Sequence, residues 1–127
     1  MHEGRIIFLI DDDEIFLMIS TVNLKTVCSG VEILTATNGE EGLTQFENVQ
    51  PNVVLLDINM PVMNGWEFLD KLSGSPASPY QNSDCSIFIT TSSVDPEDRQ
   101  KAQQHPLVKG FIEKPLTAEK IKARDIC

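Results

Sequence analysis

Two short apolar runs in this chain end directly in carboxylates. Residues 5–10 lead into Asp11, Asp12 and Asp13, and residues 53–56 lead into Asp57. A short apolar run that is followed by a turn and a helical pattern is typical of a buried parallel strand. The carboxyl ends of such strands meet at one edge of the sheet, where open α/β sheets bind their ligands. Like charges this close are unfavourable unless a cation or a shifted pKa relieves them, so the pattern indicates a divalent metal beside a reactive aspartate.

Strand and helix patterns alternate along the whole chain. Strands are predicted at residues 5–10, 32–36, 53–56, 86–90 and 108–113, and helices at 14–28, after 38–39, at 65–73, after 95 and after 117. Parallel strands joined by right-handed helical crossovers form a doubly wound sheet. We therefore expect one α/β domain over residues 1–127, with a five-stranded parallel sheet and helices on both faces. Residues 74–84, rich in Ser, Pro, Gly and Asn, are expected to form an exposed loop.

The first predicted helix carries its apolar residues near helical spacing. These residues are Ile15, Met18, Ile19, Val22 and Val27, and Ser-Gly follows at 29–30. A glycine directly after the last periodic residue is a common helix end. The spacing and the glycine together predict a helix over residues 14–28.

Composition argues against several functional classes. A formal net charge of -9 on 127 residues is unsuited to non-specific binding of nucleic acid or anionic membranes. No apolar stretch approaches the roughly 18 residues that span a bilayer, and the N-terminus has no secretory signal pattern, so a cytoplasmic location is expected. The three cysteines, Cys28, Cys85 and Cys127, are odd in number and widely spaced. We expect thiols in a reducing cytosol, with neither a disulfide nor a zinc site.

Four of the five predicted strands end at a polar group. Strand one ends at Asp11 and Asp12, strand three at Asp57, strand four at Thr91 and strand five at Lys114. Mg²⁺ prefers oxygen ligands and binds through one or two carboxylates together with phosphate oxygens and water. Aspartate can form an aspartyl phosphate, and phosphoryl transfer depends on positioning and charge neutralisation, which a metal, an ammonium and a hydroxyl provide. The combination predicts phosphoryl chemistry at this edge of the sheet.

Five motifs extend this pattern: residues 8–14 (FLIDDDE), 55–61 (LLDINMP), 63–69 (MNGWEFL), 88–93 (FITTSS) and 110–115 (GFIEKP). Together they resemble the receiver domain of bacterial two-component response regulators, over essentially all of the chain. The resemblance implies the flavodoxin-like strand order 2-1-3-4-5. It also implies a signalling switch, not an enzyme, that at most catalyses its own phosphorylation and dephosphorylation. Asp57 would accept a phosphoryl group from a histidine kinase or a histidine phosphotransfer protein.

The same resemblance implies a metal site. Asp12, Asp57 and the backbone carbonyl of Asn59 would bind Mg²⁺ or Mn²⁺ directly. Asp11 would act largely through a metal-bound water. These groups belong to the two acidic strand ends and to the loop that follows Asp57.

The resemblance further implies a set of responding residues. Lys114 would pair with phosphoryl oxygens, and its peptide bond to Pro115 is expected to be cis. Thr91 would turn its hydroxyl toward the phosphoryl group, and Phe111 would follow as the aromatic partner of the switch. We expect Thr90 to be the last strand residue and Thr91 to be exposed. The surface formed by strand four, the helix that follows it and strand five would then select an unknown downstream protein.

Two alternatives from other classes are considered. Asp11 and Asp13, separated by one residue after a strand, imitate the nucleophile and the acid/base of a haloacid-dehalogenase-type phosphatase. That class would leave Asp57 idle, and Asp13 and Glu14 are better interpreted as helix-capping and helix-dipole residues. The second alternative is a non-phosphorylated, flavodoxin-like binding module, which for a flavin would want a Ser/Thr/Gly phosphate loop where this chain has three aspartates.

The sequence also predicts how the chain associates. No output domain is expected within these residues, so the chain is either a stand-alone receiver or the receiver part of a longer protein. The last predicted helix, from residue 117 to 127, is short, and this helix often takes part in receiver dimers. We therefore expect a monomer or a weak dimer, with no direct binding of nucleic acid or membrane.

Overall fold

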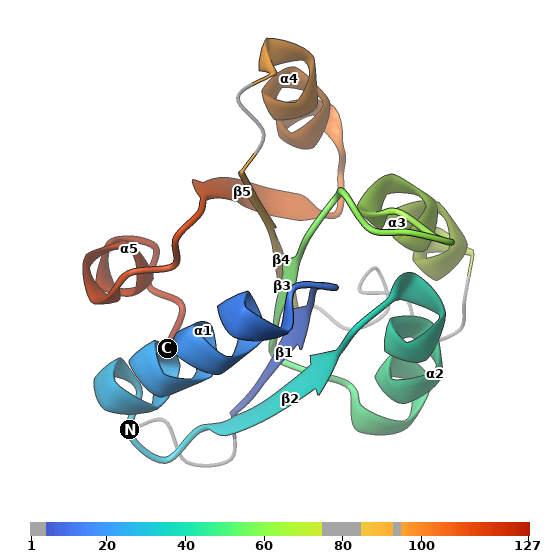
Figure 1. Cartoon of the computed structure of the whole chain (residues 1–127). Helices are drawn as coiled ribbons and strands as arrows, with labels where there is room; N and C mark the ends of the chain where they lie inside the picture. The colour runs from blue at the N-terminus through green and yellow to red at the C-terminus, as the bar shows by residue number, and fades with distance from the viewer. Residues whose placement is uncertain (1–4, 75–84, 93–94) are drawn as a thin grey trace.

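A computed structural model describes residues 5–74, 85–92 and 95–127 (Figure 1). Its five strands are β1 (Ile6–Ile10), β2 (Glu32–Ala36), β3 (Val53–Leu56), β4 (Ser86–Thr91) and β5 (Val108–Glu113). They form one sheet in the order β2-β1-β3-β4-β5, and every neighbouring pair is parallel. The predicted fold class and strand order are confirmed. Of the loop predicted over residues 74–84, all but Gly74 lies outside the described residues.

The helices form a layer on each face of this sheet. Their bounds are α1 (Glu14–Val27), α2 (Gly39–Val49), α3 (Gly65–Ser73), α4 (Pro96–Gln104) and α5 (Ala118–Ala123). Helices α1 and α5 pack on one face, and α2, α3 and α4 on the other (Figure 1). In the described residues, no helix combines the length and the apolar character needed to cross a membrane.

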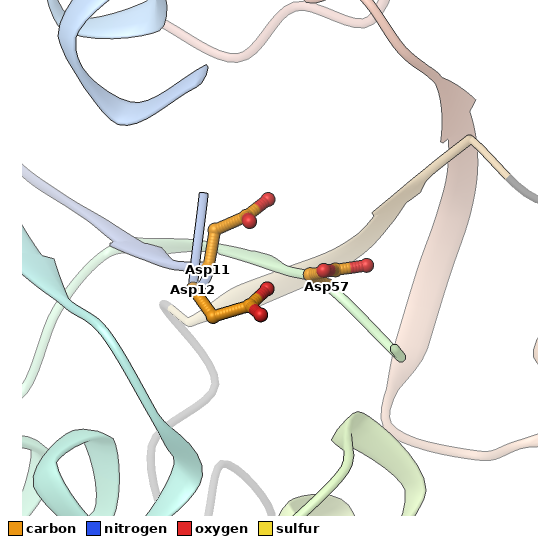
Figure 2. A group of neighbouring side chains, drawn as sticks. All are labelled: Asp11, Asp12 and Asp57. Carbon is orange, nitrogen blue, oxygen red and sulfur yellow. The ribbon is translucent and has the colours of Figure 1, made fainter. Parts of the chain in front are cut away.

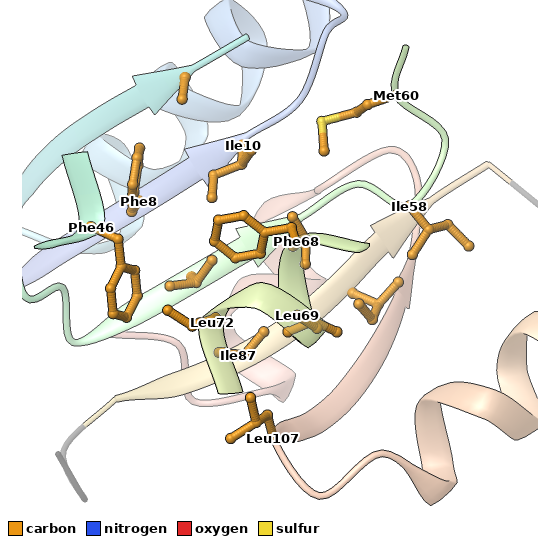
Figure 3. Packing of buried hydrophobic residues seen from close by; sticks show 14 of the residues in the cluster. Phe8, Ile10, Phe46, Ile58, Met60, Phe68, Leu69, Leu72, Ile87 and Leu107 are labelled. Atoms are coloured by element: carbon orange, nitrogen blue, oxygen red, sulfur yellow. The ribbon is translucent and has the colours of Figure 1, made fainter. Parts of the chain in front are cut away.

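Strands β1 and β3 are buried on both faces of the sheet. In β1, Phe8 and Ile10 contribute to one hydrophobic cluster, while Ile7 and Leu9 contribute to the other. A strand covered by helices on both sides needs apolar residues at every position, which explains the continuous apolar runs in the sequence. Figure 3 shows the cluster under α3, where Phe68 lies against the sheet. These two apolar strands, β1 and β3, end at Ile10 and Leu56, directly before the aspartates.

Polar side chains fix the points at which the helices start. Asp13 is the N-cap of α1, and its Oδ1 accepts hydrogen bonds from the backbone N–H groups of Ile15 (3.0 Å) and Phe16 (3.2 Å). Asn64 and Glu67 form a capping box at the start of α3. These contacts satisfy backbone donors that have no partner within the helix. The interpretation of Asp13 as a capping residue is confirmed.

Four of the five apolar residues whose spacing predicts α1 belong to its exposed side, while Val27 packs against the core. Ile15, Met18, Ile19 and Val22 have exposed fractions of 65%, 62%, 50% and 59%. The side that packs against the sheet is formed by Phe16, Leu17, Ser20 and Leu24. Because α1 carries apolar residues on both sides, the spacing identifies the helix and does not identify its buried face.

The expectation that the cysteines form no disulfide is wrong. Cys28 and Cys127 form a disulfide, with their Cα atoms 5.4 Å apart, and Cys85 is a buried free thiol. The Cα separation lies within the usual range for such bonds. The two residues meet because the segment after α5 turns back toward α1, where Ile126 is fully buried in the same cluster as Leu24. A separation of 99 residues in the sequence gives no sign of this contact.

Two element ends also differ from prediction. Strand β4 continues through Thr91, which pairs with Glu113 of β5, and both Thr90 and Thr91 are buried. The prediction that Thr91 is exposed is therefore wrong, because pairing with β5 extends the strand by one residue. Helix α5 ends at Ala123, four residues before the chain ends at Cys127.

Candidate phosphoryl and metal site

Three aspartates meet at the carboxyl ends of β1 and β3 (Figure 2). One oxygen from each of Asp11, Asp12 and Asp57 lies within 4.8 Å of the others. The backbone of Asp57 donates to the Ile10 carbonyl at 2.9 Å, so pairing between the two strands continues as far as the site. The structure confirms the prediction that the two acidic strand ends lie close together.

Burial sets the electrostatics of this cluster. Asp11 and Asp57 are 0% and 4% exposed, whereas Asp12 is open to solvent. Loss of solvation raises the pKa of Asp57 to about 6, and the negative charges of Asp11 and Asp12 act in the same direction. Lys114 and the N–H of Asn59 oppose this rise. Burial also raises the pKa of Asp11, against the opposing effects of Lys114 and the N–H of Asp13.

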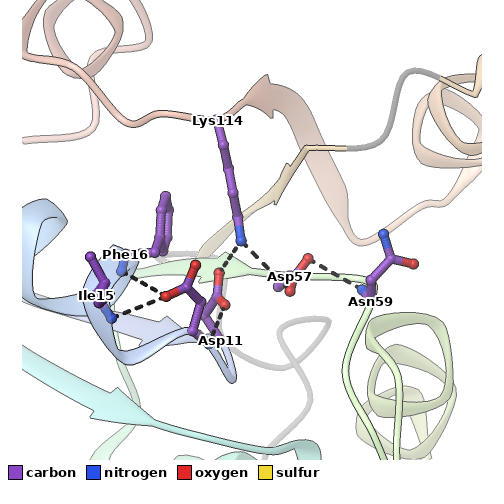
Figure 4. Close-up of polar contacts among 7 residues, drawn as sticks. Asp11, Ile15, Phe16, Asp57, Asn59 and Lys114 are labelled. Atoms are coloured by element: carbon purple, nitrogen blue, oxygen red, sulfur yellow. Dashed lines mark hydrogen bonds and ion pairs between the residues drawn. The ribbon is translucent and has the colours of Figure 1, made fainter.

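Lys114 brings the compensating positive charge from the end of β5. Its Nζ lies 2.7 Å from Oδ2 of Asp11 and 3.7 Å from Oδ2 of Asp57 (Figure 4). The same ammonium lies 4.3 Å from the centre of the Phe16 ring, at a distance suited to a cation–π contact. The peptide bond between Lys114 and Pro115 is cis, as expected.

Backbone N–H groups hold the two buried carboxylates in position. Oδ1 of Asp11 accepts from the N–H of Asp13 at 2.9 Å, and Oδ1 of Asp57 accepts from the N–H of Asn59 at 3.2 Å. Oδ2 of Asp11 is buried, and its charge is balanced by Nζ of Lys114 at 2.7 Å. One ammonium faces three carboxylates in this cluster, so a second cation would reduce the repulsion that remains.

The donor set fits a hard divalent cation. It consists of carboxylate oxygens, two of them buried and one exposed, with neither a sulfur nor an imidazole in the cluster. Mg²⁺ and Mn²⁺ prefer such ligands, whereas zinc and copper sites usually include histidine or cysteine. The chemistry of these residues therefore agrees with the predicted metal.

A glycine allows α3 to start against the end of β3. A Cβ on Gly65 would lie 2.6 Å from the carbonyl oxygen of Asp57 and 2.8 Å from Cα of Ile58. The N–H of Gly65 also donates to the Ile58 carbonyl at 3.2 Å. Real Cβ atoms do not approach backbone this closely, so a side chain at this position would displace either Asp57 or the helix.

Thr91 and Phe111, which the resemblance predicts to respond to phosphorylation, lie on β4 and β5. The carbonyl of Thr91 accepts from the backbone N–H of Lys114 at 2.9 Å, which ties the end of β4 to the site. Phe111 pairs in register with Ile89, is half-buried, and has the guanidinium of Arg99 5.2 Å from its ring centre. The structure thus connects Lys114 to Thr91 through the backbone, and Phe111 lies further along the same strand pair.

Sequence reasoning missed Phe16 as part of this site. Its ring lies beside the ammonium of Lys114, which comes from the far end of the chain (Figure 4). A signal was available, because Phe16, Ser20 and Leu24 recur every four residues on the buried side of α1. The spacing does not predict that the partner of the Phe16 ring is Lys114, which directly follows β5.

Comparisons with known proteins agree with this geometry. A family model described as a response regulator receiver domain matches residues 7–124. A probable transcriptional regulator, ycf27 of Cyanophora paradoxa, is 30% identical over 118 residues, which are 93% of this chain and 45% of that protein. The nitrate/nitrite response regulator protein NarL of Escherichia coli K12 is 41% identical over 72 residues, which are 56% of this chain and 33% of that protein. The chain spans less than half the length of the curated relatives it matches.

Solved structures give the same result. A two-component response regulator from Cytophaga hutchinsonii superposes with a TM-score of 0.83 at 31% identity, covering 95% of this chain and 93% of that one. The chemotaxis protein CheY4 of Vibrio cholerae superposes with a TM-score of 0.80 at 24% identity, covering 96% of both chains. The second likeness concerns the fold alone.

Proposed function

Because this chain belongs to the response regulator receiver family, we propose that it is a phosphorylation-dependent switch whose phosphoacceptor is Asp57. The observation that carries the proposal is the setting of that carboxylate. It is buried at the end of β3, beside two further aspartates and 3.7 Å from the ammonium of Lys114. We propose a histidine kinase or a histidine phosphotransfer protein as the donor.

In the proposed reaction, a carboxylate oxygen of Asp57 attacks the phosphorus of a phosphohistidine in line with the leaving nitrogen. A P–O bond forms as the P–N bond breaks, and the electron pair of that bond goes to the imidazole. The hydrogen bond from the Asn59 N–H to Oδ1 fixes the carboxylate and leaves Oδ2 facing Lys114. Positioning of this kind removes much of the entropic barrier to transfer.

Lys114 would neutralise part of the negative charge that the phosphoryl group adds. A phosphoryl group adds about -1.5 to -2 charges and three acceptor oxygens. The ammonium is within 3.7 Å of Asp57 and is held against Asp11 and the Phe16 ring, so a small shift brings it to the new oxygens. The approach of Lys114 to the phosphoryl group would weaken its ion pair with Asp11.

We propose that Asp12 and Asp57, together with the backbone carbonyl of Asn59, hold Mg²⁺ or Mn²⁺, with Asp11 acting largely through a bound water. The ion would neutralise charge on the carboxylates and on the transferred phosphoryl oxygens. Support comes from the all-oxygen donor set within 4.8 Å and from the excess of three carboxylates over the one ammonium that faces them.

The signal would leave the site through β4 and β5. Thr91 would turn its hydroxyl toward the phosphoryl group, and Phe111 would follow, biasing their surface between two arrangements. The backbone bond between Thr91 and Lys114 supports this coupling. We propose that the resulting surface selects a downstream protein.

The exposed side of α1 supports a protein as the phosphodonor. Its apolar residues, Ile15, Met18, Ile19 and Val22, begin three residues after Asp12. A docked helical partner would cover them and bring its histidine to the aspartates. Substituting Ile15 and Met18 by serine should slow transfer from a histidine phosphotransfer protein and leave labelling by acetyl phosphate unchanged.

A pair of variants tests the phosphoacceptor. With acetyl phosphate and Mg²⁺, the parent should gain the mass of one phosphoryl group, Asp57→Asn should gain none, and the exposed control Asp70→Asn should behave as the parent. Labelling that survives in Asp57→Asn and is lost in Asp11→Asn would instead identify a dehalogenase-type nucleophile. The use of Asp13 as a helix cap gives that alternative no support.

A fluorescence titration tests metal binding separately. Trp66 is half-buried at the start of α3, with the ammonium of Lys101 4.8 Å from its ring centre. Mg²⁺ should change its emission in the parent and not in Asp57→Asn. A flat response in the parent would favour a degenerate binding module.

The proposal also covers the domain organisation, location and oligomeric state of the chain. Residues 1–127 are proposed as one receiver domain that acts in the cytoplasm as a monomer or weak dimer, without direct contact with nucleic acid or membrane. Receivers act between histidine kinases and downstream effectors, and one relative of this chain is the autoinducer 1 sensor kinase/phosphatase LuxN of Vibrio campbellii.

A further inference from the structure

Thr90 places a hydroxyl in the interior of the protein. The residue lies on β4 and is 1% exposed, and its Oγ1 makes no hydrogen bond to any of the described residues. Most buried polar groups in proteins are hydrogen-bonded, because burying one without a partner is costly. A valine would have nearly the same shape without a polar group to satisfy. An unpaired buried hydroxyl in this place is therefore a candidate for a functional role.

The sheet register places Thr90 beside Asp57. The pairing of β3 with β4 runs as far as Leu56 and Ile89, so the residues that follow, Asp57 and Thr90, are adjacent in the next row of the sheet. Neighbouring strands are about 4.8 Å apart, which brings side chains of the same row and face within reach of each other. On its other side Thr90 pairs with Ile112 of β5. Its polar neighbour in this row is thus the proposed phosphoacceptor.

Thr90 and Asp57 also project to the same face of the sheet. Successive side chains of a strand alternate between the two faces. Leu55 of β3 and Phe88 of β4 both belong to the hydrophobic cluster under α1 and α5. The residues two positions later, Asp57 and Thr90, therefore project to that side. Lys114 approaches the Asp57 carboxylate there, with its Nζ 3.7 Å from Oδ2.

Thr90 and the next residue, Thr91, occupy different faces. By the same alternation Thr91 projects to the side of Ile89 and Phe111, which pack in the other cluster. Thr91 is the hydroxyl that the proposed switch uses. Thr90 is a second hydroxyl, on the Lys114 side of Asp57, and the switch leaves it without a role.

The carboxyl of Asp57 regains its negative charge when a phosphoryl group leaves it. In dephosphorylation, the oxygen of a water molecule attacks phosphorus, the P–O bond to Asp57 breaks, and the electron pair of that bond returns to the carboxylate. Both protons of the water leave with the inorganic phosphate. A hydrogen bond to a charged acceptor is stronger than one to a neutral acceptor. A donor beside this carboxyl therefore stabilises the transition state more than the phosphorylated ground state.

We propose that the Thr90 hydroxyl donates to the Asp57 carboxyl during dephosphorylation and thereby shortens the lifetime of the phosphoryl group. Rotation about χ1 exchanges the hydroxyl and methyl positions of a threonine, so the hydroxyl can turn toward Asp57 while the methyl group takes its place. The Lys114 ammonium is not an alternative partner for this proton, because it has no lone pair and is held by Asp11 at 2.7 Å. This inference rests on the proposed function, since it concerns the phosphoryl group on Asp57.

The lifetime of the phosphoryl group tests the proposal. The parent, Thr90→Val and Thr90→Ser are labelled with acetyl phosphate and Mg²⁺, the donor is removed by rapid desalting, and intact mass follows the loss of label in Mg²⁺ buffer. Thr90→Val should lose it about tenfold more slowly than the parent, a change of about 1.4 kcal/mol that is comparable with a hydrogen bond to a charged group. Thr90→Ser keeps the hydroxyl and should lose the label at close to the parent rate.

Stability separates the hydroxyl from the packing of the side chain. In melting curves without Mg²⁺, Thr90→Val should be at least as stable as the parent, because it removes an unpaired buried hydroxyl. Thr90→Ser should be the less stable variant, because it loses a buried methyl group. A purely structural role would therefore disturb the serine variant more, whereas the proposal predicts that the valine variant has the altered lifetime.

A matched control removes a buried hydroxyl elsewhere on the same side of the sheet. Ser20 is also 1% exposed and lies on the buried side of α1. Ser20→Ala should leave the lifetime of the phosphoryl group unchanged. Slowing in this variant equal to that in Thr90→Val would assign the effect to a general change under α1.

Three further results would overturn the proposal. Equal lifetimes in the parent and Thr90→Val would mean that the hydroxyl takes no part in dephosphorylation. Equal slowing in Thr90→Val and Thr90→Ser would assign the effect to packing, and faster loss in Thr90→Val would mean that the hydroxyl protects the phosphoryl group. Absence of label on the parent would instead refute Asp57 as the phosphoacceptor, and the role of Thr90 with it.

Discussion

Replacing Asp57 by asparagine should stabilise the protein in the absence of divalent cations. Burial, with the nearby charge of Asp11, raises the pKa of Asp57 from its ordinary 3.8 to about 6. The native state then holds its proton more tightly than the unfolded state does. Stability contributed by this proton is complete below about pH 4 and is lost as pH rises through about 6. At about 1.4 kcal/mol per pH unit, the loss at pH 7 is about 3 kcal/mol.

Asparagine removes this loss with little other change. It has nearly the same size, its side-chain oxygen can still accept from the Asn59 N–H, and Lys114 keeps its ion pair with Asp11 at 2.7 Å. Urea unfolding in EDTA at pH 7 should therefore show Asp57→Asn to be more stable than the parent by up to about 3 kcal/mol, with the gain shrinking toward pH 4. The exposed control Asp70→Asn should show no such gain at either pH.

Mg²⁺ provides a second measurement of the cost of burying the charged Asp57 carboxylate. Saturating Mg²⁺ should stabilise the parent, since it binds the native state, and should have little effect on Asp57→Asn. The reasoning fails if the variant is no more stable than the parent at pH 7 in EDTA. It also fails if the gain in stability does not depend on pH.

Three further changes test the fold. Reducing the Cys28–Cys127 bond, or replacing both residues by serine, should lower the free energy of unfolding by up to about 4.7 kcal/mol, the chain-entropy value for a loop of about 100 residues; urea midpoints that are equal with and without reductant would contradict this. Gly65→Ala should lower the melting temperature markedly and impair acetyl phosphate labelling, because its Cβ would meet backbone at 2.6 Å, while Gly74→Ala, with its nearest contact at 3.9 Å, should do neither. Phe68→Ala should cost about 3–5 kcal/mol in urea unfolding, since the ring is fully buried, and a cost below about 1 kcal/mol would mean that the ring is not packed as described.

Much of the fold and of the acidic cluster could be predicted from the chain alone. The alternation of apolar runs with helical segments gives the parallel sheet, because strands covered on both faces must be apolar throughout. The position of Asp11, Asp12 and Asp57 directly after such runs brings them to one edge, since parallel strands end together. The resemblance to receivers then supplies the role of Asp57, which remains a proposal until labelling is measured.

Failures occurred where a residue's environment comes from a distant segment. Thr91 is buried because β5 pairs with it. Cys28 meets Cys127 only because the chain turns back after α5. None of these contacts has a local signature, since each depends on how separate elements pack.

The sequence by itself determined the order of the elements and the acidic strand ends, because these follow from local periodicity and from the geometry of a parallel sheet. Only the tertiary structure decided which groups balance the aspartates. Lys114 and Phe16 are 98 residues apart along the chain, and they meet over Asp11 because β5 and α1 approach the same edge of the sheet. It likewise decided that five cations, which share no sequence motif, line two hollows along β5. Charge balance depends on distance in space, which folding sets and local sequence patterns do not encode.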